Sequence, residues 1–310
     1  GFIINRFRGD IALLEPGLDW LSERTGKPVL GVLPYLQGLV IDSEDSIGTS
    51  GSSTTDALNV IVPVLPRISQ HNDFDPLRLH PKVNLQFIGP DQPIPSADLI
   101  ILSGSQSIRT DLAWLHTQGW TQAIAKHLRY GGKVLGIGGG LQMLGEHVND
   151  PEGLEGKAGC SAGLGLLDLS TTLIAQKELQ QVQGTLHIPL DHSTLAADFS
   201  GYTMHNSVSQ GSALFRPLAV INGKNAGAIS ADNQIAGIAV HGIFDQPAAC
   251  DALLQWAGLD NSDNAVDYQQ HRLAQLDRLA DQVEQCLDTD WLRDLLGLNP
   301  STDCGANTAP

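Results

Sequence analysis

Apolar residues in this chain form short continuous runs that alternate with longer stretches of periodic spacing. Four runs have the length of buried strands, namely 60–62, 83–88, 99–102 and 134–137. Residues 111–130 and 141–148 instead repeat apolar positions every three or four residues, as amphipathic helices do. Strands that alternate with helices predict an α/β fold, in which a mostly parallel sheet is flanked by helices on both faces.

The beginning of the chain carries the same alternation on a smaller scale. We expect a strand at 1–5, a helix that Asp10 caps, and a second strand at 29–33. Because the first residue already lies inside a predicted strand, we expect the start of this α/β unit to be absent. Residues 46–56 are rich in Gly, Ser and Thr, which predicts a linker between two domains.

The second half of the chain is first rich in strands and then helical. Short β-prone runs occur at 166–173, 218–221, 226–230 and 237–240. Apolar residues then recur at helical spacing over 273–287, and this stripe predicts a docking face. The predicted organisation is a first segment at 1–45, a linker at 46–56, a domain at 57–258, a helical segment at 259–298 and a disordered tail at 299–310.

Composition and charge exclude several classes of function. The net charge is −16, so the chain repels nucleic-acid phosphates and anionic membranes. No apolar run approaches the ~20 residues of a membrane helix, and no secretory signal opens the chain. The four cysteines form no C-x-x-C pair, which argues against zinc sites and disulfide frameworks. We therefore expect a cytoplasmic protein that binds neither nucleic acid nor membrane and holds no metal.

The segment 134–145, VLGIGGGLQMLG, carries the most specific local pattern. It runs from a strand through a glycine turn into a helix, which is the geometry of a nucleophile elbow. In such an elbow, backbone amides hold an oxyanion, and the helix dipole lowers the pKa of a thiol. The spacing alone leaves two alternatives, a phosphate-binding loop and plain close packing of helix on strand, although neither phosphate-loop signature is present.

The same segment resembles the G-I-C-G-G-x-Q-M-L-G signature of cobyric acid synthases and related cobyrinate amidotransferases. Other stretches agree in the same order along the chain: 1–45, 65–77, 98–114, 163–167 and 237–245. The resemblance spans residues 1–296. It implies a class I glutamine amidotransferase-like (flavodoxin-like) domain, preceded by the tail of an α/β ATP-binding synthetase domain.

The resemblance also implies a chemistry. In that family a cysteine thiol attacks the side-chain amide of glutamine, and a histidine serves as base and acid. The thioester is hydrolysed, and ammonia passes to the synthetase site. There, ATP-activated carboxylates of adenosylcobyrinic acid a,c-diamide become amides at side chains b, d, e and g. Glutamine and a corrinoid are thus the implied substrates, with ATP and Mg bound outside this chain by a synthetase domain upstream or in trans.

Matching the family's motifs residue by residue yields a set of candidate site residues. The nucleophile position is Gly138, which has no side chain and cannot form a thioester. The base position is His241, directly after a predicted strand; without the motif, an isolated histidine is more often a packing residue. The resemblance places oxyanion donors and substrate-proximal groups at Gly139, Gly104, Ser105, Gln142 and His205.

The chain departs from the family pattern mainly around this site. Besides Gly138 for cysteine, the departures are Ser103 for Pro, Gln106 for Lys, Thr203 for Glu, Ser207 for Gly, and Ile238 and Ala239 for Thr and Tyr. Together they indicate relaxed constraint on the glutaminase pocket. Cys160 lies downstream of the elbow without an elbow of its own, so we expect an incidental cysteine and not a substitute nucleophile.

These observations favour one function and leave two alternatives. The favoured one is a cobyric acid synthase fragment that by itself has neither glutaminase nor synthetase activity. The second is a non-catalytic amidotransferase-like subunit that binds glutamine or a partner synthetase. The third, a related ligase that amidates a cell-wall precursor, is disfavoured because 1–35 resembles the corrin-type synthetase domain.

Overall fold

The computed structural model describes residues 1–39, 41, 57–190, 193–260 and 265–298, without the side chains of Lys177 and His205. Two units are distinguished by their internal contacts, one made of Gly1–Ile41 and Gln270–Pro310 and the other of Asp42–Gln269. The predicted linker at 46–56 and tail at 299–310 lie outside the described residues. The assignment of the first segment to a synthetase domain stays a prediction.

The smaller unit contains a two-stranded parallel sheet. Its elements are β1 (Phe2–Phe7), the 3-10 turn η1 (Ile11–Leu13), α1 (Glu15–Thr25), β2 (Val29–Pro34), most of α7 (Tyr268–Cys286) and α8 (Thr289–Leu295). The sequence predicts one helix capped by Asp10, but Asp10 caps η1 and a separate helix follows. The reason is Pro16, which fits only the first turn of a helix and therefore restarts it.

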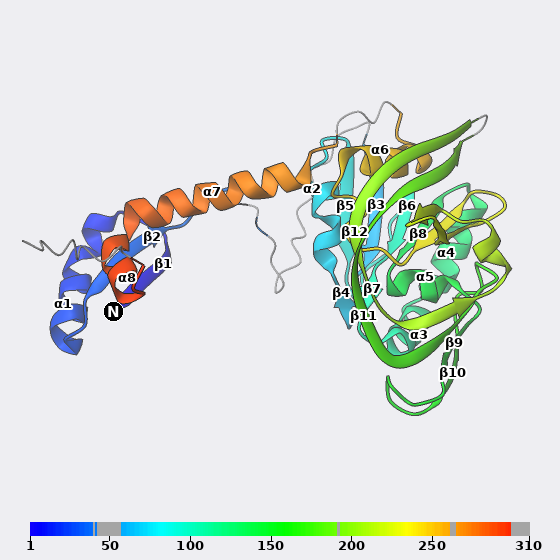
Figure 1. The fold of residues 1–310 in the computed structure, drawn as a ribbon, viewed down its shortest axis with the longest axis horizontal. Coiled ribbons are helices and arrows are strands. Elements are labelled where there is room, and N and C mark those ends of the chain that lie inside the picture. The colour runs from blue at the N-terminus through cyan, green and yellow to red at the C-terminus, as the bar shows by residue number, and fades with distance from the viewer. Residues whose placement is uncertain (40, 42–56, 191–192, 261–264, 299–310) are drawn as a thin grey trace, which may run out of the picture. The chain divides into compact units, whose positions relative to one another are not determined.

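The larger unit is built on a six-stranded sheet of order β15-β16-β8-β6-β3-β5, parallel except for the β15–β16 pair. Figure 1 labels its strands β8, β6, β3 and β5. Its strands are β3 (Leu58–Pro63), β5 (Val83–Ile88), β6 (Leu99–Leu102), β8 (Lys133–Ile137), β15 (Ala228–Ile229) and β16 (Ile235–Ile238). The helices are α2 (Asp75–Leu79), α3 (Ile108–Thr117), α4 (Trp120–Arg129), α5 (Gly139–Leu144) and α6 (Pro247–Trp256). The predicted α/β fold, with a mostly parallel sheet flanked by helices, is confirmed.

Two apolar cores lie on opposite faces of this sheet. Successive residues of a strand point to opposite faces, so Val60 and Val62 join one core while Ile61 joins the other. The first core includes residues of α2 and α6, and the second includes residues of α3, α4 and α5. Burial on both faces explains why the strands read as continuous apolar runs in the sequence.

A long antiparallel hairpin, which the sequence did not predict, dominates a second sheet. Its strands β11 (Ser170–Leu190) and β12 (Ser193–Gln210) are the green ribbons that curve across the larger unit in Figure 1. The other strands of this sheet are β9 (His147–Asp150), β10 (Gly159–Ala162), β13 (Ala219–Ile221) and β14 (Lys224–Ala226). Many hairpin residues are polar, but Val182, Leu186 and Ile188 point into the first core, which ties the hairpin down.

Two predicted element boundaries are wrong. The helix expected over 141–148 ends at Leu144, because Gly145 is extended and β9 begins two residues later. The strand expected over 166–173 begins only at Ser170, because the preceding loop donates backbone amides to carbonyls of α5 instead. Short elements complete the unit: β4 (Ile68–Ser69), η2 (His71–Phe74), β7 (Gly104–Ser105) and η3 (Ser212–Phe215).

Candidate functional site

The candidate site lies at the carboxyl ends of three neighbouring parallel strands, where open α/β sheets place their ligands. Gly104 follows β6, Gly138 follows β8, and His241 comes shortly after β16. Since β8 pairs with both β6 and β16, these three residues, distant in the sequence, meet at one edge of the sheet.

The turn after β8 is a tight elbow. Gly138 has φ 56° and ψ −118°, a backbone conformation that favours glycine, and its N–H donates to the Ile238 carbonyl at 2.9 Å. The helix α5 begins at the next residue and packs closely on the sheet. A Cβ placed on Gly140 would lie 2.0 Å from the Leu102 carbonyl oxygen, so only glycine permits this approach.

Replacing Gly140 by alanine is therefore expected to destabilise the larger unit by about 3 kcal/mol. The new methyl group would meet backbone atoms of Leu102, which cannot rotate away. Gly89→Ala is the matched control, because its Cβ would meet only the Gln92 side chain, at an ordinary 3.6 Å. Thermal denaturation of both variants tests the expectation, and equal melting temperatures would contradict it.

His241 is held by a buried carboxylate. Its Nδ1 lies 2.6 Å from Asp73 Oδ2, and the Gly242 N–H donates to Asp73 Oδ1 at 3.0 Å. Both side chains are buried. In the tautomer that carries its proton on Nδ1, His241 donates that proton to Asp73, and Nε2 is then the acceptor. The arrangement has the geometry of a base and its orienting carboxylate in acyl-transfer sites.

Sequence reasoning missed Asp73 as a site residue. It lies on η2, within the segment 65–77 that carries part of the family resemblance, and that context was the available signal. Tyr202 was also missed. Its ring stacks on the His241 imidazole with centroids 5.4 Å apart, and the two residues exchange backbone hydrogen bonds. The imidazole is therefore fixed from two sides.

The space beside Gly138 that a side chain would occupy is here called the nucleophile slot. A Cβ built on Gly138 would lie 2.7 Å from both Cε1 and Nε2 of His241, and 3.7 Å from the Cα of Gly104. A Cβ on Gly139 would lie 3.0 Å from the backbone nitrogen of Ser105. The structure thus brings together the residues at the predicted nucleophile, base and oxyanion positions.

The other two predicted residues are placed less directly. Gln142 stands one helical turn after Gly138, on the same side of α5. Its Nε2 donates to the Ser207 hydroxyl at 2.7 Å, while its buried Oε1 has no hydrogen-bond partner among the described residues. Ser207 is one of the departures from the family pattern. His205 has its backbone in β12, and its side chain is outside the described part of the chain.

A second buried carboxylate supports the loop at the slot. Ser105 Oγ donates to Asp111 Oδ2 at 2.6 Å and accepts from the Ser107 N–H at 3.0 Å. Burial raises the pKa of Asp111 above its ordinary value, and the Ser105 hydrogen bond and the Arg67 charge oppose that rise only in part. Asp111 therefore fixes the turn that carries Ser105.

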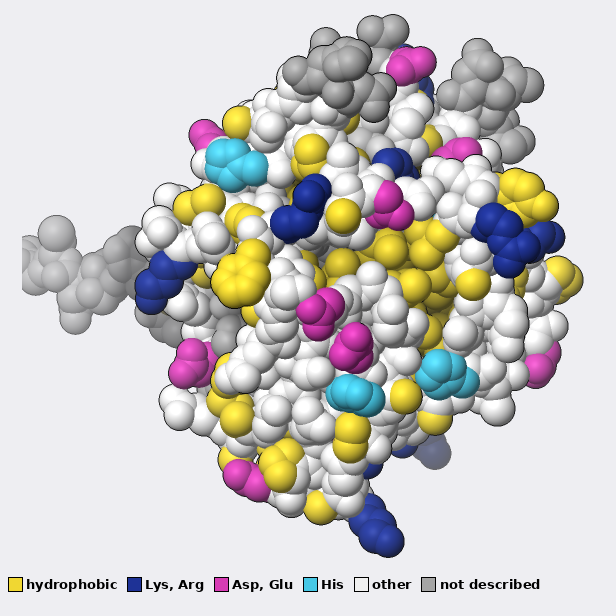
Figure 2. Space-filling model, turned by 90° about the vertical axis from the view of Figure 1, so that its right-hand side faces the viewer, with side chains coloured by type: hydrophobic (Ala, Val, Ile, Leu, Met, Phe, Trp, Pro, Cys, Tyr) yellow, Lys and Arg dark blue, Asp and Glu magenta, His cyan; other side chains and the backbone are white. Residues whose placement is uncertain are grey.

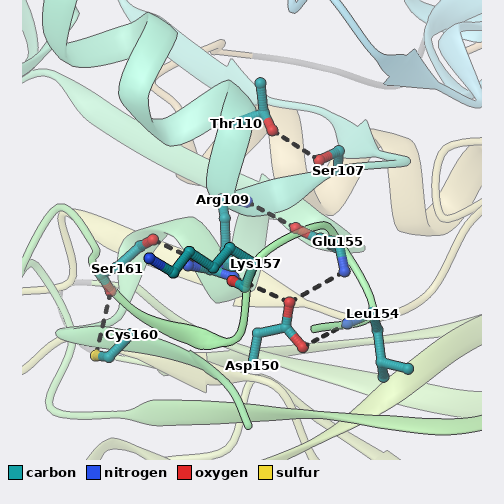
Figure 3. A network of polar contacts seen from close by, with 9 residues as sticks. All are labelled: Ser107, Arg109, Thr110, Asp150, Leu154, Glu155, Lys157, Cys160 and Ser161. Atoms are coloured by element: carbon teal, nitrogen blue, oxygen red, sulfur yellow. Dashed lines mark hydrogen bonds and ion pairs between the residues drawn. The ribbon is translucent and has the colours of Figure 1, made fainter. Parts of the chain in front are cut away.

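Cys160 belongs to a different part of the unit. It lies on β10, exposed, with Sγ 3.8 Å from His147 Nδ1; Figure 3 shows it beside Ser161. Next to it, Arg109 of α3 donates from Nη1 to Asp150 at 2.9 Å and from Nε to Ser161 at 3.1 Å. The Arg109 contacts tie the β9–β10 loop to α3. None of these contacts, nor the contact of Cys160 with His147, involves His241.

A separate pocket opens at the opposite edge of the sheet. It has a volume of about 400 Å³ and is lined by residues at the start of β6 and the end of α4, including Asp98, Ile100, Lys126 and Tyr130. Since Asp98 precedes β6 whereas Gly104 follows it, this pocket is distinct from the slot. On the face that Figure 2 shows, apolar side chains are gathered in one area and charged side chains are scattered around it; this area is not assigned to the pocket.

The described residues contain no group of three or more His, Cys, Asp or Glu side chains that could hold a metal ion. Within the same part of the chain, no helix combines the length and apolar character needed to cross a membrane.

Comparisons with known proteins identify a family and several similar solved structures. A family model described as a CobB/CobQ-like glutamine amidotransferase domain matches residues 59–249. PurLQS from Thermotoga maritima is 16% identical, with 71% of this chain and 99% of that chain covered and a TM-score of 0.46. Another solved structure, described as a glutamine amidotransferase, is 14% identical, with 64% of this chain and 98% of that chain covered and a TM-score of 0.43. The family match includes both the elbow and His241.

Proposed function

The chain belongs to the family of CobB/CobQ-like glutamine amidotransferase domains, and from this premise we propose that it is the amidotransferase-like part of a cobyric acid synthase that no longer hydrolyses glutamine. One observation carries the proposal. Gly138 stands at the elbow beside the His241 imidazole, and it has no side chain that could form the thioester. The resemblance of 1–45 to the corrin-type synthetase domain supports the choice of substrate.

The proposal assigns the nitrogen source and the ATP-dependent step elsewhere. Without a thioester, the amide nitrogen would come from free ammonia. Activation of the corrinoid carboxylates by ATP and Mg would take place on a synthetase domain, upstream or in trans. The present chain would form the amidotransferase-like domain that accompanies the synthetase domain. The Asp73–His241 pair would remain in it without a thiol to activate.

Purified chain incubated with L-glutamine is expected to release no glutamate above the background of its His241→Ala variant. The physical reason is that the base has no thiol to activate, so covalent catalysis cannot begin. A glutamate dehydrogenase-coupled assay measures the release. Turnover in the wild-type chain that His241→Ala abolishes would contradict the proposed loss of glutaminase activity.

A second candidate function is a non-catalytic subunit that binds glutamine. The observation that favours it is the retained packing of the site, in which Asp73 and Tyr202 still hold the His241 ring. Ligand binding to the folded state raises its stability by RT ln(1 + [L]/Kd). We therefore expect millimolar glutamine to raise the melting temperature without turnover. A melting curve that does not change with glutamine concentration would contradict this function.

A further inference from the structure

The smaller unit carries polar residues at the carboxyl ends of its two parallel strands. β1 ends at Phe7 and β2 ends at Pro34, and these strands are followed directly by Arg8 and Tyr35. The Tyr35 N–H donates to the Phe7 carbonyl at 2.8 Å, which holds the two strand ends together. Open α/β sheets bind their ligands at this edge. The residues therefore stand where the topology favours a site, in a different unit from His241.

Two guanidinium groups lie over one aromatic ring at this edge. The Cζ atom of Arg8 is 4.0 Å from the centroid of the Tyr35 ring, and the Cζ atom of Arg6 is 5.6 Å from it. The face of an aromatic ring attracts a cation. A guanidinium that stacks on a ring keeps its N–H groups in its own plane, so they remain available as donors. Tyr35 therefore positions forked donors without occupying them.

The backbone at Arg6 is strained and bulged. Arg6 has φ 55°, a left-handed conformation that is unfavourable for a residue with a side chain. The register of β1 on β2 shifts at the same place, so that Asn5 and Arg6 stand opposite Leu33 alone. Bulges and strained backbone of this kind re-aim side chains and are frequent next to functional sites. The fold thus accepts a local strain at the residue that carries one of the two guanidinium groups.

Neither arginine has a carboxylate partner within the part of the chain that the structure describes. Acidic residues outnumber Lys and Arg by 34 to 18, so acids are plentiful in this chain. Asp10, the nearest acid in the sequence, accepts from the Ala12 N–H and caps η1. Arg6 and Arg8 are both exposed, and like charges over one ring repel each other. A bound anion would remove this repulsion.

The overall charge of −16 does not prevent anion binding at this edge. Exposed charges are screened over about 8 Å at physiological salt, so a ligand at Arg6 and Arg8 interacts mainly with nearby groups. A third guanidinium reaches the segment that follows Tyr35, because Arg278 of α7 donates from Nη2 to the Gln37 carbonyl at 2.8 Å. Positive charge is therefore concentrated locally in an acidic protein.

We propose that Arg6 and Arg8, held over Tyr35, form a binding site for a small soluble oxyanion with two or more negative charges. The edge of each guanidinium presents paired N–H donors, which match two oxygens of a phosphate or a carboxylate group. The site belongs to the smaller unit and depends neither on glutamine nor on the proposed loss of glutaminase activity.

Isothermal titration of the full chain at physiological salt, with pyrophosphate and with citrate as probes, tests the proposal. At least one probe should bind with a Kd below about 1 mM, and the stronger of the two distinguishes a phosphate from a carboxylate ligand. Arg6→Gln and Arg8→Gln should each weaken that binding at least about 10-fold, because each removes charge-assisted hydrogen bonds. Arg24→Gln is the matched control and should bind as the wild type does. It removes the same charge from an exposed side chain at the end of α1, before β2 begins.

A conservative variant separates a forked donor site from a general attraction of positive charge. Arg8→Lys keeps the charge but loses the planar fork, so it should bind the stronger probe about 3- to 10-fold more weakly at an unchanged melting temperature. The side-chain Nε resonances of Arg6 and Arg8 should shift with the Kd that the titration yields.

Three results would overturn the proposal: no binding of either probe, equal affinities of Arg8→Lys and wild type, or an equal loss in Arg24→Gln and Arg8→Gln. The last two would mark the bound probe as an adventitious ion only. None of these results bears on glutamate release, so failure of this site and failure of the proposed function are distinguishable.

Discussion

The Gly138→Cys variant is expected to release glutamate from glutamine at least about 10³-fold faster than the wild-type chain. The new thiol would stand at an elbow whose backbone already has the required turn, with His241 as base and Asp73 as its orienter. The family resemblance places oxyanion donors at Gly139 and Ser105, and a Cβ on Gly139 would lie 3.0 Å from the Ser105 nitrogen, so the two backbones are close together. This substitution supplies the thiol, which is the part of a thiol-dependent glutaminase that glycine at position 138 lacks.

The same substitution should cost stability. A side chain at φ 56° is strained, and a Cβ at 2.7 Å from the His241 ring forces that ring to shift. We expect a loss of about 1–3 kcal/mol in the free energy of unfolding. Gly138→Ala imposes the same strain without a thiol, so it separates the cost of the side chain from the gain of chemistry.

Two measurements check this prediction. The coupled glutamate assay should show activity in Gly138→Cys that is absent in Gly138→Ala and in Gly138→Cys/His241→Ala. An electrophilic glutamine analogue, such as a chloromethyl ketone, should label the new thiol and not the exposed Cys160. If Gly138→Cys folds, as its melting transition reports, and remains silent in both assays, the missing thiol is not the sole defect. Departures such as Ser207 and Thr203 would then have removed the activity as well.

The second large effect is expected at Asp150, where replacement by alanine should destabilise the larger unit by about 3–5 kcal/mol. Asp150 is fully buried at the end of β9. Its Oδ1 accepts from the Leu154 N–H at 2.8 Å, and its Oδ2 accepts from the Glu155 N–H at 3.0 Å and from Arg109 at 2.9 Å (Figure 3). Removing the carboxylate leaves two amides and one guanidinium without this acceptor.

This network also predicts a pH dependence. Burial opposes ionisation of Asp150, but the amides of Glu155 and Leu154 and the Arg109 guanidinium outweigh it and hold the pKa below its ordinary 3.8. A carboxyl whose pKa is lower in the folded state contributes stability that is fully present above the unfolded value. That contribution is lost as the pH falls through the lower, folded pKa. The wild type should therefore lose stability below about pH 4, and the isosteric Asp150→Asn should lose less over the same range.

Urea denaturation between pH 7 and pH 2.5, with hydrogen exchange of the β9–β10 peptide, measures both effects. Glu152→Gln is the matched control, because Glu152 is an exposed acid in the same loop and should change stability by less than about 0.5 kcal/mol. Equal stabilities of Asp150→Ala and Glu152→Gln would contradict the prediction. A parallel pH dependence in Asp150→Asn and wild type would assign the acid sensitivity to other groups.

Local patterns predicted the elements that local interactions specify. The strand and glycine turn at 134–140 could be predicted because burial, turn conformation and close packing all act within a few residues there. The end of the following helix could not, because Gly145 and the strand after it depend on pairing with distant β-strands. The hairpin β11–β12 could not be predicted for the same reason. Its sequence is largely polar, and the hairpin is stabilised by cross-strand pairing and by packing of one face on the first core.

The sequence by itself predicted the fold class and the glycine elbow, and its family resemblance implied a nucleophile position at Gly138 and a candidate base at His241. Only the tertiary structure decided what surrounds them. Asp73 meets His241 across 168 residues, and the Tyr202 ring, which stacks on the His241 imidazole, comes from the hairpin. Such contacts form where strand ends and loops converge, and residue spacing along the chain does not encode that convergence.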